Sequence, residues 1–345
     1  MHKYDLAVFI GRFQPFHMGH YEVIKEALKH AEMVLVLVGS SFTPRSYRNP
    51  FTYDERSDMI KNAFSLSEQT RILTYPIVDS IYNDVVWIES IQTIVDSVHV
   101  VNYNHTEKKI CLVGHEKDHS SFYLKLFPQW DNIAVENVEN ISSTDIRKNY
   151  FNVREVTWSK YRFKLPENVD DFLVKFSATS DYDNLVDEYK FVQDYKKSWD
   201  DAPYEPIFVT TDAVVIQSGH ILLIERKARP GKGLWALPGG FLNPNEKILD
   251  GVLRELKEET KIKVPLPVLK GNIVAQKVFD DPFRSSRGRT ITHGFLIHLP
   301  PEAKLPLVKG SDDAKTAKWF PLAEVTRSMM FEDHFDIIEN LTNLL

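Results

Sequence analysis

The stretch GRFQPFHMGH, residues 11–20, directly follows the apolar run YDLAVFI at residues 4–10. The run predicts a buried strand, and apolar residues at helical spacing over residues 18–31 predict a helix immediately after the stretch. Gly11 allows a close backbone approach or an unusual backbone angle, and Pro15 rigidifies the bend. The stretch therefore predicts a tight connection at the carboxyl end of a strand, where α/β proteins bind their ligands.

The rest of the chain divides into three regions with different patterns. Residues 1–150 alternate strand-like and helix-like segments, which is typical of a parallel sheet covered by helices. Residues 151–206 break this alternation and are interpreted as a tail of the first domain plus a linker, with a loop at SATSDYDN (177–184). Residues 207–345 predict a second, mixed α/β domain that ends in a helix over about residues 323–343.

Composition limits the classes of function. The 345 residues are 43% hydrophobic and 26% charged, as in an ordinary globular protein of two domains. The net charge of -6 argues against general binding to nucleic acids or anionic membranes, and no apolar run reaches the roughly 20 residues of a membrane helix. The single cysteine, Cys111, favours a buried core position and a reducing compartment, and we expect a cytoplasmic protein without an export signal.

Two histidines in the opening stretch predict a phosphate site. His17 and His20 are three residues apart at the start of the predicted helix, so both imidazoles lie near its positive end. Imidazoles and free amides there can donate to a phosphate group that gains negative charge during a reaction. A second motif, NISSTDIRK (140–148), offers hydroxyls that can cap a helix and Arg147 for an anion.

These motifs resemble those of a known family. GRFQPFHMGH together with ISSTDIR resembles the nucleotidyltransferase superfamily, and three further stretches are similar to nicotinamide-mononucleotide adenylyltransferases of the archaeal type. They are NPFTYDERSDMI (49–60), PIVDSIYNDVVWIESI (76–91) and GHEKDHSSFYLKLFP (114–128). The resemblance covers about residues 4–150. It implies a Rossmann-like domain with a parallel sheet that transfers AMP from ATP to nicotinamide mononucleotide, giving NAD and pyrophosphate.

The resemblance also implies residue roles. They are His17 and His20 for the transition-state phosphate, Arg12 and Arg147 for phosphates, Ser143 and Thr144 for the triphosphate end, Trp87 for stacking on the nicotinamide ring with Asn83 nearby, and Gly11 and Phe13 for substrate binding. Trp87 has a core role as its alternative. Arg56 can contact phosphate or pair with Asp54 or Asp58, and HEKDH (115–119) is interpreted as a polar loop.

A second motif occupies residues 239–262, GGFLNPNEKILDGVLRELKEETKI. Its leucines and valine recur at the spacing of one helix face, while Glu255, Glu258 and Glu259 fall within an arc of about 100° on another face. Clustered carboxylates repel one another unless cations lie among them, and their hard oxygens suit Mg²⁺ or Mn²⁺. Arg254 can brace Glu258 or reach back to Glu246.

With LPGG directly upstream, this motif resembles the box of Nudix hydrolases, and residues 207–325 resemble the ADP-ribose pyrophosphatase half of bifunctional adenylyltransferase–Nudix proteins. The resemblance implies an α/β/α domain that hydrolyses ADP-ribose to AMP and ribose 5-phosphate. It implies metal binding by Gly239, Glu255, Glu258 and Glu259, catalysis by Glu255 and Glu259, and phosphate neutralisation by Arg284, Arg287 and Arg289. The catalytic base stays open among Asp280, Asp281, Asp312 and Asp313.

Lys261 departs from this pattern, because a glycine usually stands there. The position is expected to have left-handed backbone, which costs a lysine about 1–2 kcal/mol, so we expect a modified helix end with an intact metal site.

Two alternatives remain for the function: a Nudix domain that senses nucleotides, and a different acceptor or nucleotide in the transfer. The sequence leaves homo-oligomerisation, the choice between amide and acid mononucleotide, and coupling between the sites open.

Overall fold

The structure is a computed structural model that describes residues 2–103, 107–114, 125–135, 141–152, 162–311 and 313–345. The chain forms two compact units, Met1–Asp187 and Glu188–Leu345. No helix in the described ranges combines the length and the apolar character needed to cross a membrane.

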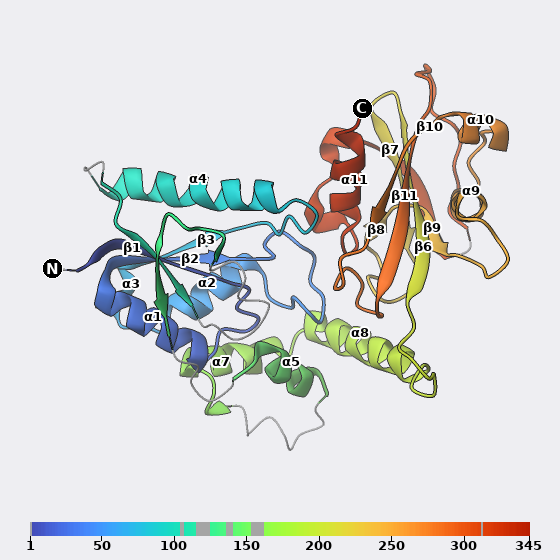
Figure 1. The fold of residues 1–345 in the computed structure, drawn as a ribbon. Helices are drawn as coiled ribbons and strands as arrows, with labels where there is room; N and C mark the ends of the chain where they lie inside the picture. The colour runs from blue at the N-terminus through green and yellow to red at the C-terminus, as the bar shows by residue number, and fades with distance from the viewer. Residues whose placement is uncertain (1, 104–106, 115–124, 136–140, 153–161, 312) are drawn as a thin grey trace. The chain divides into compact units, whose positions relative to one another are not determined.

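The first unit is built on a five-stranded parallel sheet with the order β3-β2-β1-β4-β5. Figure 1 shows α4 along one face of this sheet and α1 on the other. The central strands are buried on both faces, as their continuous apolar runs predict. The strands are β1 (Tyr4–Gly11), β2 (Ala31–Val38), β3 (Ile72–Pro76), β4 (Ile110–Gly114) and β5 (Asp131–Ala134). The predicted Rossmann-like parallel sheet is confirmed.

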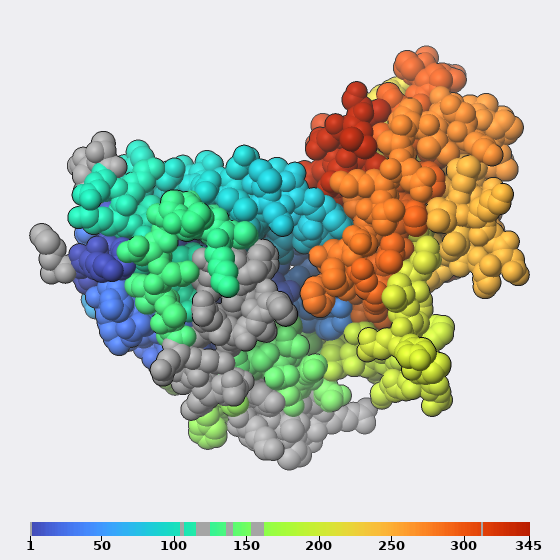
Figure 2. All heavy atoms as spheres, in the orientation of Figure 1, coloured from blue at the N-terminus to red at the C-terminus, as the bar shows by residue number. Residues whose placement is uncertain are grey.

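Helices of the first unit cover this sheet and extend beyond it. They are α1 (Met18–His30), α2 (Tyr53–Lys61), α3 (Leu66–Gln69), α4 (Asp84–Asn102), α5 (Ser143–Asn152) and α7 (Glu167–Phe176). Val100 and Val101 of α4 are exposed. Figure 2 shows this helix, in cyan, at the surface of the first unit. Cys111 is buried in β4, as expected, and burial raises its pKa to about 12.

The strand order changes direction between β1 and β4, since β2 and β3 lie to one side of β1 and β4 and β5 to the other. A crevice forms outside the carboxyl ends of parallel strands at such a switch point. Gly11 is the last residue of β1, so the sheet topology places the stretch at residues 11–20 at this point. Register supports the same geometry, because Gly11 pairs with Val38 at the end of β2.

The loop predicted at residues 177–184 is only partly correct. Residues 177–179 are non-helical, but α8 begins at Ser180 and continues to Lys197, across the boundary between the units. The Thr179 hydroxyl accepts from the amide of Tyr182 at the helix start. Acidic residues in the first turn stabilise the helix, because they lie near its positive end. In the sequence, the same residues are typical of a loop as well.

The second unit is built on a mixed sheet with the order β10-β11-β6-β7-β12, to which β8 and β9 add at β7 and β6. β11 runs parallel to β6, and the other pairs are antiparallel. The strands are β6 (Phe208–Gln217), β7 (His220–Arg226), β8 (Trp235–Ala236), β9 (Gly239–Phe241), β10 (Ile273–Phe279), β11 (Thr290–His298) and β12 (Ala314–Pro321). The predicted mixed sheet is confirmed.

Helix α9 (Ile248–Thr260) packs its apolar face into the core of the second unit through Val252, Leu253 and Leu256. The other helices are α10 (Leu266–Gly271) and α11 (His334–Thr342). The last helix is shorter than predicted, because residues 322–333 form two short 3-10 turns and connecting segments.

Candidate active sites

The bend after β1 is fixed by backbone geometry and ring packing. A Cβ atom added to Gly11 would lie 2.9 Å from the ring of Phe13, so glycine is required there by close approach. The unusual backbone angle falls on Phe13 instead, whose φ is 52°, and the Gln14–Pro15 peptide is cis. The Phe13 side chain is only 1% exposed, so its ring belongs to the core of the bend, and its predicted part in substrate binding stays a prediction.

The two histidines stack on each other at the start of α1. Their ring centroids are 3.6 Å apart with an interplanar angle of 21°. His17 is the N-cap residue and is buried, and Phe13 and Phe16 pack against the His20 ring at centroid distances of 4.9 and 5.7 Å. The sequence spacing therefore does bring both imidazoles together, and aromatic packing holds them in one orientation.

The first amides of α1 are largely used within the protein. The Met18 amide donates to the carbonyl of Lys164 at 2.9 Å, and the His20 amide donates to the carbonyl of His17 at 2.9 Å. The expected cluster of free amides at this helix start is therefore wrong for these two groups. Charge and donors for an anion must come mainly from side chains.

The ISSTDIR motif lies against the bend. Arg147 Nη1 donates to the carbonyl of Gln14 at 2.6 Å, and its Nη2 donates to the Thr144 hydroxyl at 3.2 Å. Ser142 Oγ accepts from the Thr144 amide, so a hydroxyl caps α5 as predicted. Ser143 Oγ donates to the carbonyl of Pro15 at 3.1 Å, which gives this hydroxyl a role in joining the two motifs.

Burial leaves Arg147 as a poorly hydrated cation. Burial, together with the nearby charge of Arg12, lowers the pKa of Arg147 to about 10. The group stays charged at neutral pH, and Arg12 is exposed at the same bend. Two neighbouring guanidinium groups repel each other, so an anion placed between them is favourable.

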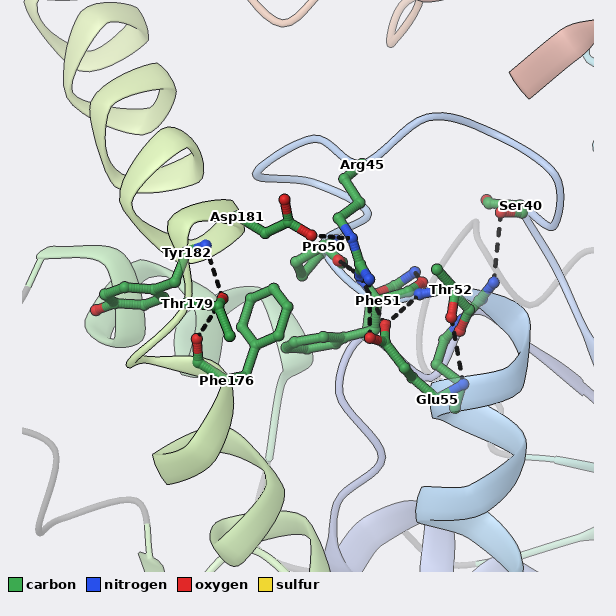
Figure 3. A network of polar contacts seen from close by, with 12 residues as sticks. Ser40, Arg45, Pro50, Phe51, Thr52, Glu55, Phe176, Thr179, Asp181 and Tyr182 are labelled. Atoms are coloured by element: carbon green, nitrogen blue, oxygen red, sulfur yellow. Dashed lines mark hydrogen bonds and ion pairs between the residues drawn. The ribbon is translucent and has the colours of Figure 1, made fainter. Parts of the chain in front are cut away.

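Arg56 differs from both alternatives drawn from the sequence. It does not pair with Asp54 or Asp58; its guanidinium is 1% exposed and donates to backbone carbonyls. Figure 3 labels two of these acceptors, Ser40 and Thr52. The motif NPFTYDERSD therefore contains a buried cation, Arg56, that is hydrogen-bonded to the backbone of the surrounding loops.

The start of α4 carries the residues expected to meet the nicotinamide ring. Asn83 is exposed, and its side chain accepts from the amide of Val86 as the N-cap. Trp87 is half-buried and packs against the core of the first unit, including the ring of Phe127 at 6.2 Å. The core alternative for Trp87 therefore has support. The HEKDH stretch (115–119) lies outside the described residues.

In the second unit, two glycines allow β9 to approach its neighbours closely. A Cβ atom on Gly239 would lie 2.1 Å from the carbonyl oxygen of Thr211 in β6. A Cβ atom on Gly240 would lie 2.6 Å from the carboxylate of Glu255 in α9. The LPGG turn is thus packed between a strand and the acidic helix face, which explains the two glycines physically.

Glu259 is buried at this contact. Its Oε2 accepts from the Gly239 amide at 2.9 Å, and its side chain is only 5% exposed. Burial, together with the neighbouring charge of Glu255, raises the pKa of Glu259 to about 8. Burial also raises the pKa of Glu255. Desolvated carboxylates beside each other, next to a backbone turn, fit a hard divalent cation.

Glu258 is placed differently from the other two glutamates. It is 42% exposed and accepts from Arg254 Nη1 at 2.9 Å. Arg254 also donates to Glu246 and Glu255. Both contacts predicted for Arg254, with Glu258 and with Glu246, are therefore present. Within the described part of the chain, no three His, Cys, Asp or Glu side chains are arranged to hold a metal. Glu259 and Glu255 both lie at the LPGG turn, at Gly239 and Gly240, and Arg254 connects Glu255 to the more exposed Glu258.

Two residues of this site were missed in the sequence. Asp212 in β6 is 5% exposed, accepts from the Thr292 hydroxyl, and has its pKa raised by burial. Arg226, at the end of β7, lies over the Phe331 ring at 3.9 Å, and burial lowers its pKa. Both interact electrostatically with Glu259. An alternating strand pattern offered no signal that singled out either residue.

The three arginines expected to neutralise substrate phosphates have separate environments. Arg284 is buried and forms a two-pronged ion pair with Asp333, at 2.8 and 2.9 Å, and its predicted phosphate contact stays a prediction. Arg289 donates to the carbonyl of Asp280. Arg287 stacks over Phe241 at 4.9 Å, and no hydrogen bond reaches its buried Nε among the described residues.

Lys261 adopts the left-handed conformation itself, with φ 48° and ψ 27°, at the end of α9. The expected modified helix end is therefore wrong. The neighbouring Lys257 ammonium donates to the carbonyls of Ile262 and Val264, which stabilises the chain just beyond the helix.

The LPGG turn is also held by a hydrogen bond from a distant segment: the Leu237 amide donates to Nδ1 of the buried His334 at 3.0 Å.

Comparisons with known proteins agree with the two units. A family model described as cytidylyltransferase-like matches residues 8–149, and one for the NUDIX domain matches residues 207–341. The nicotinamide/nicotinic acid mononucleotide adenylyltransferase of Acinetobacter baylyi is 37% identical over 191 residues, 55% of this chain and 96% of that protein. The ADP-ribose pyrophosphatase of Methanocaldococcus jannaschii is 35% identical over 132 residues, 38% of this chain and 71% of that protein.

One solved structure is similar over nearly the whole length. It is the bifunctional NMN adenylyltransferase/ADP ribose pyrophosphatase of Francisella tularensis, complexed with AMP and a Mn ion. The match has a TM-score of 0.90 at 37% identity and covers 99% of each chain. The chain therefore belongs to the family of bifunctional NMN adenylyltransferase/ADP ribose pyrophosphatases, in which a cytidylyltransferase-like domain precedes a NUDIX domain.

Proposed function

We propose that the first domain, residues 1–150, transfers AMP from ATP to nicotinamide mononucleotide, giving NAD and pyrophosphate. The observation that carries this proposal is the stacked pair His17 and His20 beside Arg147 at the carboxyl end of β1. These are donors and a cation without an adjacent activated nucleophile, which suits a reaction whose nucleophile belongs to the substrate.

The reaction forms one bond and breaks one. A phosphate oxygen of the mononucleotide attacks the α-phosphorus of ATP, and the bond from that phosphorus to the β-phosphate bridging oxygen breaks as pyrophosphate leaves. His17 and His20 donate to the oxygens that gain charge, while Arg12 and Arg147 hold the polyphosphate. Ser143 and Thr144 bind its far end, and Asn83 and Trp87 border the nicotinamide. No protein group needs to remove a proton.

We further propose that the second domain, residues 207–345 after a tail and linker at 151–206, hydrolyses ADP-ribose to AMP and ribose 5-phosphate. Glu255, Glu259 and the Gly239 carbonyl would hold Mg²⁺, or Mn²⁺ in its place, with Glu258 at the rim. Such ions neutralise a diphosphate and lower the pKa of bound water. Arg254 orients the glutamates, and Arg287, with Arg289 nearby, binds the substrate diphosphate.

The partners proposed are therefore small nucleotides: ATP, nicotinamide mononucleotide, NAD and ADP-ribose. The carboxylates of the second site, together with the Mn ion in the related Francisella tularensis structure, support Mg²⁺ or Mn²⁺ as the cofactor. We extend Mg²⁺ to the first reaction as the companion of ATP. A net charge of -6 supports a protein that binds no nucleic acid or membrane surface, and we propose the cytoplasm as its location.

Two assays on the purified protein test these proposals. The first contains ATP, Mg²⁺ and nicotinamide mononucleotide, and we expect chromatography to detect NAD and pyrophosphate in equal amounts. The second contains ADP-ribose with Mg²⁺ or Mn²⁺, and we expect AMP and ribose 5-phosphate. The acid mononucleotide and CTP, each offered in separate reactions, measure the choice of acceptor and nucleotide.

Each assay has an outcome that contradicts one proposal alone. Absence of NAD in the first mixture would reject adenylyl transfer to this acceptor. ADP-ribose that stays intact with both metals, yet still binds, would indicate a nucleotide sensor in the second domain. The two reactions share one preparation, so activity in one assay shows that the protein sample is folded.

A further inference from the structure

Arg56 connects three backbone segments at the carboxyl edge of the first sheet. Its Nη1 donates to the carbonyl of Arg12 at 2.7 Å and to the carbonyl of Gly39 at 2.6 Å. Its Nε donates to the carbonyl of Thr52 at 3.0 Å, at the start of its own helix. Three charge-assisted hydrogen bonds from one fully buried guanidinium fix these segments relative to one another.

Two of the connected segments form the phosphate-binding edge. Arg12 directly follows β1, and Gly39 directly follows β2. The Gly39 amide donates to the carbonyl of Gly11 at 2.8 Å, so the two strand ends are already in contact. The hydrogen bonds of Arg56 are a second connection between them. The position of the Arg12 side chain over the site therefore depends on the backbone that Arg56 holds.

Arg56 also adds positive charge there. In the described residues, no carboxylate lies within ion-pair distance of its guanidinium, because the neighbouring Glu55 pairs with Arg45 at 2.6 Å (Figure 3) and Asp79 accepts from Ser40. Burial lowers the pKa of Arg56 to about 10, so it remains a cation at neutral pH. The carboxylates of Asp79 and Glu55 act on this charge through space and offset part of it, while its hydrogen bonds go to neutral carbonyls.

We infer that Arg56 is a positioning residue for the polyphosphate of the nucleotide substrate: it holds the Arg12 backbone in place and supplies a buried positive charge beneath the phosphates. This inference rests on the proposed adenylyl transfer. It assigns Arg56 no contact with substrate, so its effect reaches the reaction through Arg12 and through the electrostatic potential of the site.

The test compares two substitutions of Arg56 with one control. Arg56→Lys keeps the charge but loses the forked hydrogen bonds, whereas Arg56→Gln keeps a donor and loses the charge. Arg71→Gln is the matched control, because Arg71 also donates to three backbone carbonyls, those of Leu28, Ala31 and Glu32, but at the amino end of β2. ADP-ribose hydrolysis by the same samples reports on the second domain.

We expect the KM for ATP to rise about 10- to 100-fold in Arg56→Gln, because this variant loses both a buried positive charge near the phosphates and the hydrogen bonds that hold the Arg12 backbone. The rise should be smaller in Arg56→Lys, which keeps the charge. The KM for nicotinamide mononucleotide should change less. In Arg56→Gln, added salt should weaken ATP binding less than in the wild type. Arg71→Gln should lower the melting temperature and leave the KM for ATP unchanged.

Two results would overturn the inference. One is that Arg56→Gln melts at a lower temperature but keeps the wild-type KM for ATP, which would make Arg56 purely structural. The other is that Arg56→Lys and Arg56→Gln raise the KM for ATP equally and with unchanged salt dependence, which would remove the role of charge. A wild-type protein that makes no NAD would instead contradict the proposed function.

Discussion

The two candidate sites contain buried charges of opposite sign. In the first unit, burial lowers the pKa of the guanidinium groups of Arg56 and Arg147. In the second unit, burial raises the pKa of the carboxyl groups of Asp212 and Glu259. In both cases removal from water disfavours the charged form, and a ligand of opposite charge relieves that cost. The first site is therefore suited to a polyphosphate and the second to metal cations.

The sites also differ in what holds their charged groups. Backbone carbonyls bind Arg56 and Arg147, so the cations are fixed by the loops that border the site. In the second site, a backbone amide binds Glu259, and the guanidinium of Arg254 contacts three glutamates. Loss of a cation should thus disturb the first site as a whole, whereas loss of a carboxylate should remove one ligand and leave the fold of the second intact.

Glu259→Gln should give the largest effect on activity. The amide keeps the size of the side chain but cannot carry the negative charge that a cation needs, so hydrolysis of ADP-ribose should fall by roughly 10³-fold or more. Steady-state assays with Mg²⁺ and with Mn²⁺ measure this, and NAD synthesis by the same sample should be unchanged. Joint loss of both activities would contradict two independent sites, and Glu258→Gln, at the exposed position, should have a much smaller effect.

His20→Asn should be the matching change in the first site. Asparagine keeps a hydrogen-bond donor, but it cannot stack against His17, and its donor does not reach the position of the imidazole nitrogen. The kcat for NAD synthesis should therefore fall by about 10²- to 10³-fold. Hydrolysis of ADP-ribose should stay at the wild-type rate, which checks the sample. If kcat stayed constant while only the KM for ATP rose, the imidazoles would bind the ground state and would not favour the transition state.

The buried carboxyl of Glu259 should make the metal-free second unit less stable at high pH. Its folded pKa of about 8 lies above the ordinary 4.5, so the folded state holds a proton that the unfolded state releases. The free energy of unfolding should therefore fall as the pH rises from about 4.5 to 8, by up to about 1.4 kcal/mol per pH unit. Calorimetry in EDTA measures the fall, and added Mn²⁺ should reverse it.

Glu259→Gln separates this effect from other titrations in the same unit, such as that of Asp336, whose pKa burial raises to about 6. In EDTA at pH 8 the variant should be more stable than the wild type, and at pH 5 the two should unfold at similar temperatures. Equal stability at both pH values would mean that Glu259 is already ionised without metal. The proposed cation site would then lose its electrostatic basis.

The sequence predicted what depends on local pattern. The two sheets and the apolar face of α9 follow from periodicity, and the pairing of the two histidines follows from helix geometry. What it could not predict depends on packing between distant segments. Arg284 pairs with Asp333 49 residues away, and the carbonyl of Lys164 accepts from the Met18 amide. Such partners are set by the tertiary fold, so one residue's chemistry alone does not identify them.

Lys261→Gly should give the smallest effect, a gain in stability confined to the second unit. Lys261 has a left-handed backbone at the end of α9, a conformation that glycine adopts without the Cβ clash. Removing that clash should raise the free energy of unfolding by about 1 kcal/mol, less the extra chain entropy of glycine. Chemical denaturation measures it, with Lys263→Gly nearby as the control. Because Lys261 is not a ligand, hydrolysis of ADP-ribose should be unchanged; slower hydrolysis would show that the strained helix end positions Glu259.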